Sequence, residues 1–431
     1  MAPLATHPLV RFDNYVVRFD NYVVRFDNCA WVVWSPMRVL LLNYEFPPVG
    51  GGAGYATANI ASSLANMGIE AEVLTSRING EVDGELVDGV PVHRVWSWRN
   101  GIHDCGLRGA YTYVMSAALK RRQLHAERHY DIEHYFFSMP TGLLTLIPGL
   151  KSSTPYIVSL RGSDVPGYDP FNKKVEWIHA LLKPVTRRIW KDARKVIALS
   201  DALAETAKET APDLEIGVIP NGIDTDQFSP PEQRASRRTT RLITVARLLE
   251  RKGIHTILEA ISGPTQLPVE LQIIGTGPYE SELRQRVDEL GLGNRVHFLG
   301  YVPNEELPAY YRRSDIFVLP SATESFGLVF AEAMSCGLPI AASNVGGIPE
   351  TVRDGIDGLL CSPDDPASLR ENIIRLMSCA DTREDISNSQ RQRILEHYPW
   401  EHIAARYADV YRSALASQGT APLRSERPMQ H

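Results

Sequence analysis

Hydrophobic runs alternate with amphipathic stretches along most of the chain. After Met37, an apolar run at 39–42 leads into a glycine-rich loop, an amphipathic stretch from Tyr55 to Asn66 closed by Gly68, and a second apolar run at 71–75. Short apolar runs bounded by turn residues predict buried parallel strands, and apolar residues at helical spacing between them predict helices. This alternation is typical of the opening of a doubly wound α/β domain.

The same alternation restarts in the second half of the chain. A turn at Pro220-Asn221-Gly222 and a polar, basic stretch over 229–241 separate two series of predicted strands. The remaining strands are expected at 90–95, 156–160, 196–199 and 216–219 in the first series, and at 242–246, 271–274, 296–299, 316–319, 339–342 and 358–360 in the second. The predicted fold class is therefore α/β, with two doubly wound, Rossmann-like domains whose facing edges form a ligand cleft.

The length of the chain agrees with two domains, because 431 residues exceed what one hydrophobic core comfortably serves. We place the first domain over 37–210 and the second over 211–397. Before them, the heptapeptide Val10 to Val16 recurs at Val17 to Val23 and begins again at Val24. These copies are too few for a stacked repeat fold. We expect residues 1–36 to be an extension outside the fold.

Composition narrows the function classes. An apolar content of 44% and a charged content of 22% are ordinary for a globular protein. The net charge of -6 argues against a nucleic-acid binder with a broadly basic surface. Five scattered cysteines without a C-x-x-C pair fit a reducing cytoplasm and match no familiar zinc pattern. No apolar stretch approaches the roughly 18 residues of a membrane-spanning helix.

One segment departs from the acidic balance. From Lys183 to Lys195 the chain is rich in lysine and arginine and has aromatic flanks. Such a segment can dock on anionic lipid headgroups, or it can be an ordinary solvated helix face. The solvated face is the simpler interpretation, and peripheral contact of a cytoplasmic protein with the inner face of a membrane stays open as the alternative.

The most informative chemistry lies between Pro320 and Pro339, where Glu324 and Glu332 are separated by seven residues. A predicted strand ends at Leu319, and a helix is predicted from Phe326 to Ser335. Glu324 then lies at the crossing from strand to helix, where free amide N–H groups suit a phosphate. Carboxylates accept hydrogen bonds and repel phosphate, so the two glutamates suit hydroxyl groups. A nucleotide sugar is a ligand that contains both phosphate groups and many hydroxyl groups.

Cations and glycine loops occur at the ends of other predicted strands. Arg247 follows the first strand of the second domain and Lys252 follows shortly after, so both can hold a diphosphate and stabilise its developing charge. The loop with Gly51 and Gly52, and the sequence from Gly275 to Gly277, let a backbone approach a ligand closely. The second strand ends without the acidic residue of a dinucleotide site, which argues against a dehydrogenase.

Two further motifs are ambiguous. Arg161 and Asp164 follow a strand of the first domain, and they can either face the cleft or hold the turn as an ion pair. Asp224-Thr225-Asp226 matches a metal-binding D-x-D pattern, but its place directly after Asn221-Gly222 favours a turn. The histidines show no metal spacing.

Together these segments resemble the GT-B glycosyltransferases, in particular glycosyltransferase family 4, from Met37 to about Ala416. The segments that carry the resemblance are NYEFPPVGGGAGYATANIASSLA, SLRGSDVPG, VIPNGIDTDQF, VARLLERKGI, IIGTGP, FLGYVP and PSATESFGLVFAEAMSCGLPIAASNVGGIPE. The final PWEHIAARYADVY resembles the helix with which these enzymes cross back onto the first domain. That helix is expected over 398–417, followed by a disordered tail over 418–431.

The resemblance implies a hexose-type sugar moved from a nucleotide diphosphate sugar, with retention of configuration, to a hydroxyl of a polysaccharide or glycolipid. Glu324 would contact the donor sugar, Glu332 the ribose, and Arg247 and Lys252 the diphosphate. The other donor contacts implied are Gly51, Gly52, Gly275, Gly277, Tyr301, Val302, Phe326, Gly327, Leu328 and Val329. No metal or other cofactor is implied, because the cations and helix N-termini supply the positive charge.

One position departs from the family pattern. Many members carry a histidine where this chain has Arg161, so only proximity to the acceptor side of the cleft carries over to Arg161 and Asp164. Two alternative functions stay open: a GT-B-fold sugar-nucleotide epimerase, and a non-catalytic module that binds a sugar nucleotide. The base, the sugar and the acceptor are not determined by the sequence.

Overall fold

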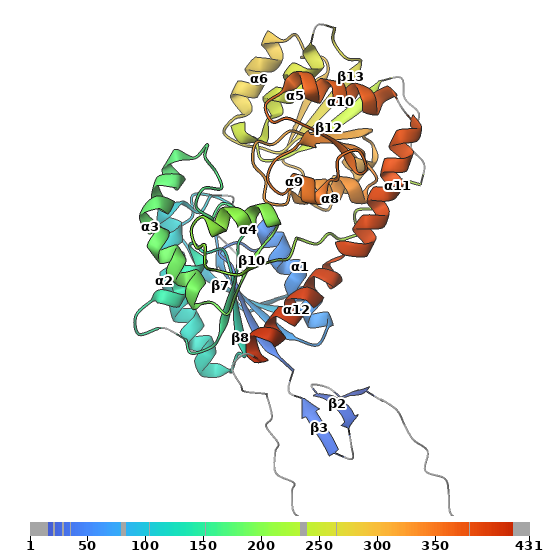
Figure 1. Ribbon diagram of the computed structural model, residues 1–431. Helices are drawn as coiled ribbons and strands as arrows, with labels where there is room; N and C mark the ends of the chain where they lie inside the picture. Colours follow the sequence, from blue (N-terminus) through green and yellow to red (C-terminus); the bar gives the residue numbers. More distant parts are fainter. Residues whose placement is uncertain are drawn as a thin grey trace, which may run out of the picture.

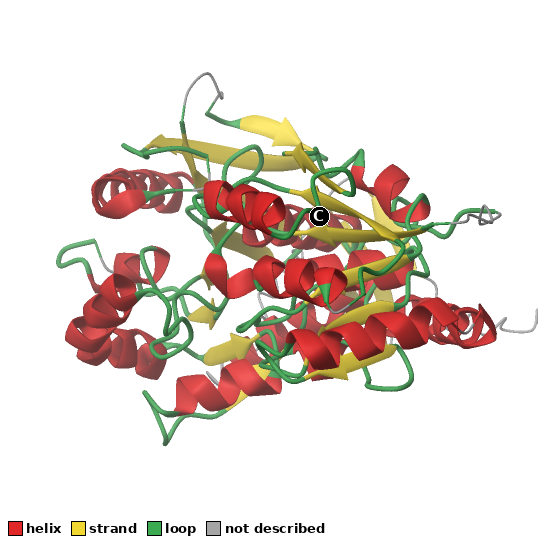
Figure 2. Cartoon of the chain, turned by 90° about the horizontal axis from the view of Figure 1, so that it is seen from above, coloured by secondary structure: helices red, strands yellow, loops and turns green. Residues whose placement is uncertain are grey.

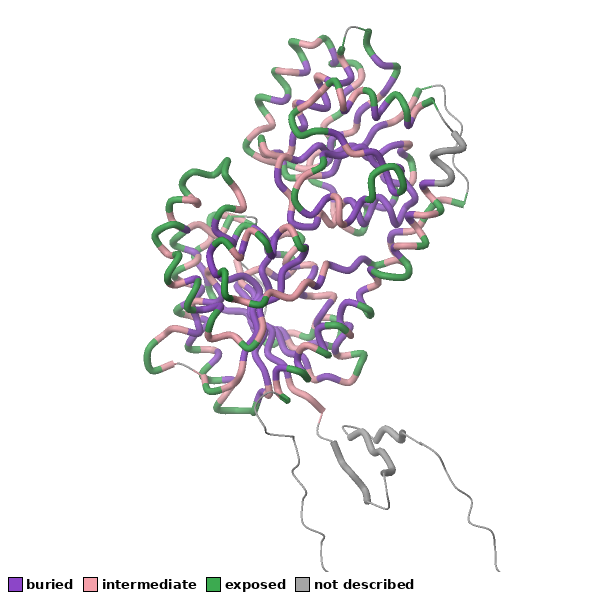
Figure 3. The backbone as a smooth tube through the Cα atoms, in the orientation of Figure 1, coloured by how far each residue is buried: buried purple, intermediate pink, exposed green. Residues whose placement is uncertain are grey.

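The protein consists of two α/β domains joined along one side by the last two helices, as the computed structural model shows (Figure 1). Side chains are described for residues 36–78, 83–102, 104–150, 152–232, 239–263, 265–378 and 386–416, and the backbone alone for 16–19, 22–27, 30–34 and 380–385. Seen from above, helices lie on both sides of the sheets (Figure 2). The strands form the buried centre of each domain (Figure 3).

The first domain is built on an eight-stranded sheet in the order β11-β10-β9-β8-β4-β5-β7-β6. Its strands are β4 (Arg38–Leu42), β5 (Glu70–Arg77), β6 (Glu85–Val87), β7 (Val90–Trp96), β8 (Ile132–Phe136), β9 (Tyr156–Ser159), β10 (Lys195–Ala198) and β11 (Ile216–Val218). All neighbours are parallel except β6 and β7. Because β11 belongs to this sheet, the first domain extends to Val218, and the predicted boundary at 210 is too early.

The direction of the crossovers places the helices of this domain. The helix α1 (Gly52–Asn66) connects β4 to β5 in one direction along the sheet. The elements α2 (Gly106–Glu127), η1 (Thr141–Leu146), α3 (Lys173–Asp192) and α4 (Asp201–Lys208) connect strands in the opposite direction. Since parallel crossovers are right-handed, α1 lies on one face of the sheet and the other four lie together on the opposite face.

The second domain has a six-stranded parallel sheet in the order β14-β13-β12-β15-β16-β17. Its strands are β12 (Thr240–Val245), β13 (Val269–Ile274), β14 (Val296–Gly300), β15 (Ile316–Leu319), β16 (Ile340–Ser343) and β17 (Gly358–Cys361). The order reverses between β12 and β15, and in such sheets ligands bind outside the carboxyl ends of the strands at this switch point. The helical elements are η2 (Glu250–Lys252), α5 (Ile254–Ser262), α6 (Glu280–Glu289), α7 (Leu307–Arg312), α8 (Leu328–Ser335), α9 (Ile348–Thr351) and α10 (Pro366–Ser378).

The chain passes between the domains twice at neighbouring points. The amide of Ile223 donates to the carbonyl of Tyr398 at 2.7 Å, next to a β-bridge between Ile223 and Pro399. Gly222 is required there, because a Cβ atom would lie 2.6 Å from the ring of Trp400. Beyond this crossing, α11 (Ala380–His397) gives way to α12 (Trp400–Ala416), which packs on α1. The predicted return of the last helix to the first domain is confirmed.

The regions outside the two domains are only partly described. The strands β1 (Val16–Phe19), β2 (Tyr22–Asp27) and β3 (Ala30–Trp34) form an antiparallel sheet that is separate from the two domain sheets. The rest of the predicted extension before Pro36, and the tail predicted over 418–431, lie outside the described residues.

A buried ionic cluster fastens α2 to the middle of the first sheet. Arg121 of α2 donates to both carboxylate oxygens of Glu133 on β8, at 2.7 and 3.1 Å. Tyr135 donates to the same carboxylate at 2.9 Å, and a ring nitrogen of His125 lies 2.7 Å from it. Burial alone would raise the pKa of Glu133, but His125 and Arg121 lower it below its ordinary value. Glu133 is therefore a buried carboxylate with matched partners.

Glu133→Gln is expected to lower the free energy of unfolding of the first domain by about 3–5 kcal/mol, because it leaves Arg121 buried without its counter-charge. Urea unfolding followed by circular dichroism measures the change. Glu127→Gln on the exposed end of α2 is the matched control and should change stability by less than about 0.5 kcal/mol. Equal effects of the two variants would contradict the role given to the cluster.

Candidate active site

The switch point of the second domain brings two predicted site residues into direct contact. Lys252 lies on η2 after β12, and Glu324 lies in the loop after β15. The Lys252 Nζ atom is 2.5 Å from Glu324 Oε2, and the two side chains are only 13% and 11% exposed. The sequence predicted both residues at the site but assigned them to different parts of the ligand. In the structure they form one nearly buried ion pair.

The helix that follows Glu324 begins at Leu328, two residues later than predicted, and ends at Ser335. Its N-cap is Gly327, with a φ of +74° and no side-chain cap. Uncapped helix N-termini offer amide donors to an anion. The loop before it is held by close backbone packing, since Gly347 donates to the carbonyl of Glu324 at 2.9 Å. A Cβ atom on Gly346 would lie 2.3 Å from that oxygen.

Glu332 lies in the interior of α8 and is buried. Its carboxylate accepts a hydrogen bond of 2.7 Å from the hydroxyl of Tyr311 on α7. Burial raises the pKa of Glu332 to about 7, although the bond from Tyr311 lowers it. A carboxyl group with so high a pKa is unfavourable to ionise. Further hydrogen-bond donors from a ligand would stabilise its charged form.

Arg247 and the glycines after β13 are coupled through their backbones. Arg247 is exposed. A Cβ atom on Gly275 would lie 1.9 Å from the carbonyl oxygen of Ala246, and one on Gly277 would lie 2.2 Å from that of Leu248. The two glycines therefore let the loop after β13 pack against the residues on either side of Arg247. This packing is sufficient to explain why glycine is needed at both positions. The contact of these glycines with a donor stays a prediction.

The glycine-rich loop of the first domain meets the helix start of the second. A Cβ atom on Gly52 would lie 2.9 Å from the end of the Leu328 side chain, so the first residues of α1 and α8 approach each other closely across the two domains. The amide of Gly51 donates to the Glu45 carboxylate at 3.3 Å. This loop thus binds an anionic group already, one that the chain itself supplies.

The acceptor-side candidates lie at the end of β9 but have structural partners. Asp164 accepts from the amide and hydroxyl of Ser138, at 2.6 and 2.9 Å, and from the amides of Arg161 and Gly162, at 2.8 and 3.1 Å. The Arg161 guanidinium is buried and donates to the side chain of Asn221 at 2.6 Å. Asp164 therefore holds the loop through its backbone, and Arg161 connects β9 to the interdomain crossing.

The structure adds residues of the first domain that the sequence did not indicate. Arg251, next to Lys252, forms an ion pair of 3.2 Å with Asp169. The hydroxyl of Thr323 donates to the carbonyl of Tyr168 at 3.1 Å. Burial, together with the nearby Glu324 charge, raises the pKa of Tyr168 to about 12. The loop from Arg161 to Asp169 therefore covers the Lys252–Glu324 pair from the opposite domain.

A second contact crosses the cleft near the predicted base site. Tyr301 is exposed and Val302 is buried, directly after β14. The side chains of Tyr301 and Tyr55, which belongs to α1, share a hydrogen bond. Burial and this neighbour raise the pKa of Tyr55 to about 12. Tyr55 is thus an additional candidate for the nucleotide end of the site.

The D-x-D sequence has the turn role that its position favoured. Asp224 accepts hydrogen bonds from the amides of Asp226 and Gln227, at 3.0 and 2.9 Å. Across the described residues, no three histidine, cysteine, aspartate or glutamate side chains gather closely enough to hold a metal ion.

Comparison with known proteins agrees with this geometry. The family of glycosyl transferases group 1 matches residues 226–393, and the glycosyl transferase 4-like domain matches residues 51–222. The chain belongs to the family 4 type of GT-B glycosyltransferases. The two matches divide this glycosyltransferase at the first interdomain crossing, which gives one match for each of the two domains.

Relatives of the glycosyltransferase match along nearly their whole length. A GDP-mannose-dependent alpha-(1-6)-phosphatidylinositol monomannoside mannosyltransferase of Mycobacterium tuberculosis is 28% identical over 412 residues, covering 87% of this chain and 98% of the relative. A D-inositol 3-phosphate glycosyltransferase of Corynebacterium urealyticum is 28% identical over 424 residues, covering 88% and 96%. The sucrose-phosphate synthase of Thermosynechococcus elongatus shares the fold, with a TM-score of 0.77, 23% identity, and coverage of 88% and 100%.

These findings establish a glycosyltransferase fold with a site suited to sugar-nucleotide donors. Among the helices of the described residues, none is both long and apolar enough to cross a membrane.

Glu332→Gln is expected to stabilise the protein relative to wild type as the pH rises. The pKa of Glu332 is about 7 in the fold against an ordinary 4.5. The folded protein therefore binds the extra proton between these values, and wild-type stability falls as the pH rises through this window. Between pH 5 and pH 8 the variant should gain about 2.5 kcal/mol on wild type.

Thermal and urea unfolding at both pH values measure this difference. Glu371→Gln on the exposed face of α10 is the control for the loss of one carboxyl group. A difference between Glu332→Gln and wild type that does not change with pH would contradict the raised pKa.

Proposed function

We propose that this glycosyltransferase moves a hexose-type sugar from a nucleoside diphosphate sugar to a hydroxyl of a polysaccharide or glycolipid, with retention of the anomeric configuration. The observation that carries the proposal is the Lys252–Glu324 pair at the switch point, next to the uncapped start of α8. A cation, amide donors and a carboxylate meet there, and these are the groups that a sugar joined to a diphosphate requires.

The phosphate half of the donor is assigned to positively charged groups. Lys252, Arg247 and the amides of Phe326 to Val329 would surround the diphosphate at the switch point, and the loop with Gly51 and Gly52 would approach it from the first domain. As the bond from the anomeric carbon to the diphosphate oxygen breaks, negative charge grows on that oxygen. Preorganised cations and amides stabilise this charge, so the proposal includes no metal.

The hydroxyl-rich half of the donor is assigned to the two glutamates. Glu324 would accept from sugar hydroxyls and release Lys252 toward the phosphate. Glu332 would accept from the ribose, and Tyr301, Val302 and Tyr55 would surround the base. Retention follows when the acceptor oxygen attacks on the same face that the diphosphate leaves. The departing phosphate oxygen then takes the acceptor proton, so the step needs no nucleophile from the protein.

The acceptor is assigned to the first domain, where Arg161 and Asp164 shape the end of β9. Relatives support acceptors that are lipids or small polyols, since one of them is named for a phosphatidylinositol mannoside and another for inositol 3-phosphate. The basic segment from Lys183 to Lys195 lies on this same domain. It supports a cytoplasmic enzyme in peripheral contact with an anionic membrane as part of the same proposal.

Replacement of Glu324 and of Lys252 by alanine, one at a time, tests the assignment. Each variant should lower kcat for transfer by roughly 100- to 1,000-fold, because each removes a group that acts on the reacting part of the donor. Lys208→Ala is the matched control, since that partly exposed lysine on α4 also has a glutamate partner, at 2.7 Å. Unchanged turnover in both site variants would refute the site.

The same assays separate the other functions. An epimerase would convert the donor sugar without any acceptor, and a binding module would retain the donor without converting it. Transfer products, donor isomers and donor hydrolysis are therefore measured together.

A panel of UDP-, GDP- and ADP-sugars in thermal-shift measurements identifies the donor base, because a ligand that binds only the folded state raises its stability. If ribose hydroxyls donate to Glu332, the bound state favours the charged carboxylate. The shift from the preferred nucleotide should therefore grow as the pH rises from 6 to 8, through the pKa of about 7. In Glu332→Gln this growth should disappear; its persistence would separate Glu332 from the ribose.

A further inference from the structure

The outward sides of α2 and α3 expose a set of large apolar side chains. On α2, Leu107, Tyr111, Met115 and Leu119 follow one another at intervals of four residues, and each is 43–68% exposed. Residues four apart lie on the same side of a helix, so these side chains form one stripe. On α3, Trp177 and Leu181 have the same spacing and are 67% and 64% exposed. Contiguous exposed apolar surface of this kind marks an interaction site.

The two stripes belong to one surface, which we name the α2–α3 face. Both helices lie on the same side of the first sheet (Figure 1), and each of them contacts η1. Arg121 of α2 donates to the carbonyl of Leu144 in η1, and Gly142 of η1 lies against Ile189 of α3. Since both helices cover the same side of this sheet, their exposed residues lie on the outer surface of that side.

The α2–α3 face is positively charged although the whole chain carries a net charge of -6. Residues 171–195 contain eight lysines and arginines but two acidic residues. The exposed cations of α3 are Lys173, Lys174, Lys183, Arg187, Arg188 and Lys191. Of the two acidic side chains, Glu176 accepts from the amide of Gly167 and Asp192 pairs with Arg188. Arg187 pairs with Asp213 at 3.2 Å. The remaining cations keep the face basic.

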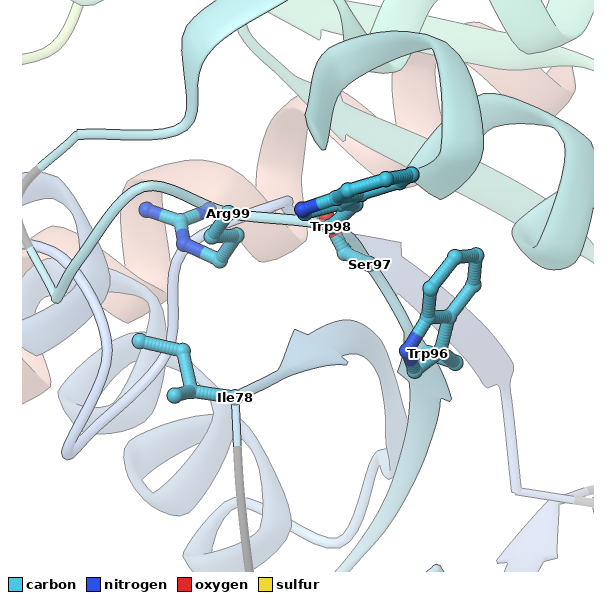
Figure 4. Close-up of a pocket in the computed structure, with 5 residues that line it drawn as sticks. All are labelled: Ile78, Trp96, Ser97, Trp98 and Arg99. Carbon is cyan, nitrogen blue, oxygen red and sulfur yellow. The ribbon is translucent and has the colours of Figure 1, made fainter. Parts of the chain in front are cut away.

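Two tryptophans extend the apolar stripe toward the cleft. Trp96 and Trp98 are 51% and 57% exposed and border a cavity of about 380 Å³ with Ile78, Ser97 and Arg99 (Figure 4). The Arg108 side chain of α2 lies over the Trp98 ring, at 5.5 Å. Just beyond, the carbonyl of Ile102 accepts from the amide of Gly50, in the glycine-rich loop of the site. The apolar surface thus runs from the middle of α2 to the edge of the active site.

We infer that the α2–α3 face docks on an anionic lipid bilayer, with Leu107, Tyr111, Met115, Trp177 and Leu181 entering its interfacial layer and the cations of α3 meeting its headgroups. Apolar and aromatic side chains beside lysine and arginine are the composition that lies flat on such a surface. Docking with a second copy would bring two basic faces together, which like charge opposes.

This inference deepens the proposed function, on which its consequence for the acceptor rests. A bilayer on the α2–α3 face would lie beside the acceptor-side end of the cleft. A hydroxyl carried by a membrane lipid could then reach the donor while the rest of the lipid stays in the bilayer. The α2–α3 face therefore gives a physical reason to expect a lipid-linked acceptor. This reason is independent of the substrates for which the relatives are named.

Vesicle co-sedimentation of the full chain tests the inference. Wild type should bind vesicles of phosphatidylcholine and phosphatidylglycerol and bind phosphatidylcholine alone much more weakly. Lys173→Glu with Lys174→Glu should weaken binding at least 25-fold, at roughly five-fold for each cation removed. These positions begin α3, where glutamate is compatible with the helix dipole. Leu107→Ala with Tyr111→Ala, and Trp177→Ala with Leu181→Ala, should each weaken binding roughly ten-fold.

The matched controls are on α10 of the second domain. Ile374 is 40% exposed there, and Arg375 is exposed beside it. Ile374→Ala and Arg375→Glu should leave vesicle binding unchanged. Raising the ionic strength from about 0.1 to about 1 M shortens the Debye length from roughly 10 to 3 Å, and it should reduce the part of binding that depends on Lys173 and Lys174.

Three outcomes would overturn docking: no binding to anionic vesicles, equal weakening by the α10 variants, or a dimer in light scattering that Leu107→Ala with Tyr111→Ala dissolves. Stabilisation by the preferred nucleotide is measured on every variant. It should be retained in all of them, because the face lies outside the donor site. Lost vesicle binding with intact nucleotide binding therefore refutes only the docking, whereas a wild type that no nucleotide stabilises refutes the proposed function.

Discussion

The Lys252–Glu324 pair is the contact on which the rest of the site depends. Its two members lie in the segments that follow β12 and β15, the two strands at which the sheet order reverses, so their meeting is a direct result of the fold. Nearly buried charges are costly to remove from water, and each compensates the other in the absence of a ligand. A donor with a phosphate and sugar hydroxyls supplies a new partner for each. The pair therefore keeps the site preorganised without leaving an unmatched charge in it.

The second glutamate illustrates a different compromise. Glu332 is buried with one described hydrogen-bond partner, Tyr311, and its carboxyl group is difficult to charge. A residue chosen for stability alone at this place in α8 would be apolar. A glutamate here is explained if a ligand provides the missing hydrogen bonds. Glu332 then lowers the stability of the free protein but makes ligand binding more specific.

The sequence predicts the parallel strands well where they are apolar, and every predicted strand is present within two residues at each end. The strand β8, central in the first sheet, was not predicted, because Glu133 and His134 interrupt its apolar run. The helix α2 was not assigned either. Its stripe from Leu107 to Leu119 is exposed while Arg121 is buried, which reverses the usual amphipathic pattern. Hydrophobic periodicity fails where burial is ionic or where exposure is apolar.

For the candidate site, strand ends and glycines were sufficient to indicate which residues of the second domain lie beside the switch point, and the contacts of these residues with a donor stay a prediction. The contributions of Tyr55, Tyr168 and Asp169 were not predictable, because they arise from contacts between residues far apart in the chain and on different domains. Local patterns contain no information on how one domain is placed over the other. The direct pairing of Lys252 with Glu324 also depends on side-chain conformations that spacing does not determine.

The two neighbouring crossings at Ile223 and Tyr398 have a mechanical consequence. Two connections joined by a hydrogen bond form a hinge between the domains. Such a hinge permits the second domain to rotate about one axis and resists its twisting or sliding relative to the first. Because α12 is anchored on α1 beyond that line, the second domain cannot drift away from the first. The geometry favours opening of the interdomain cleft by rotation about this one axis. Product and donor would then leave and enter through the same side of the cleft.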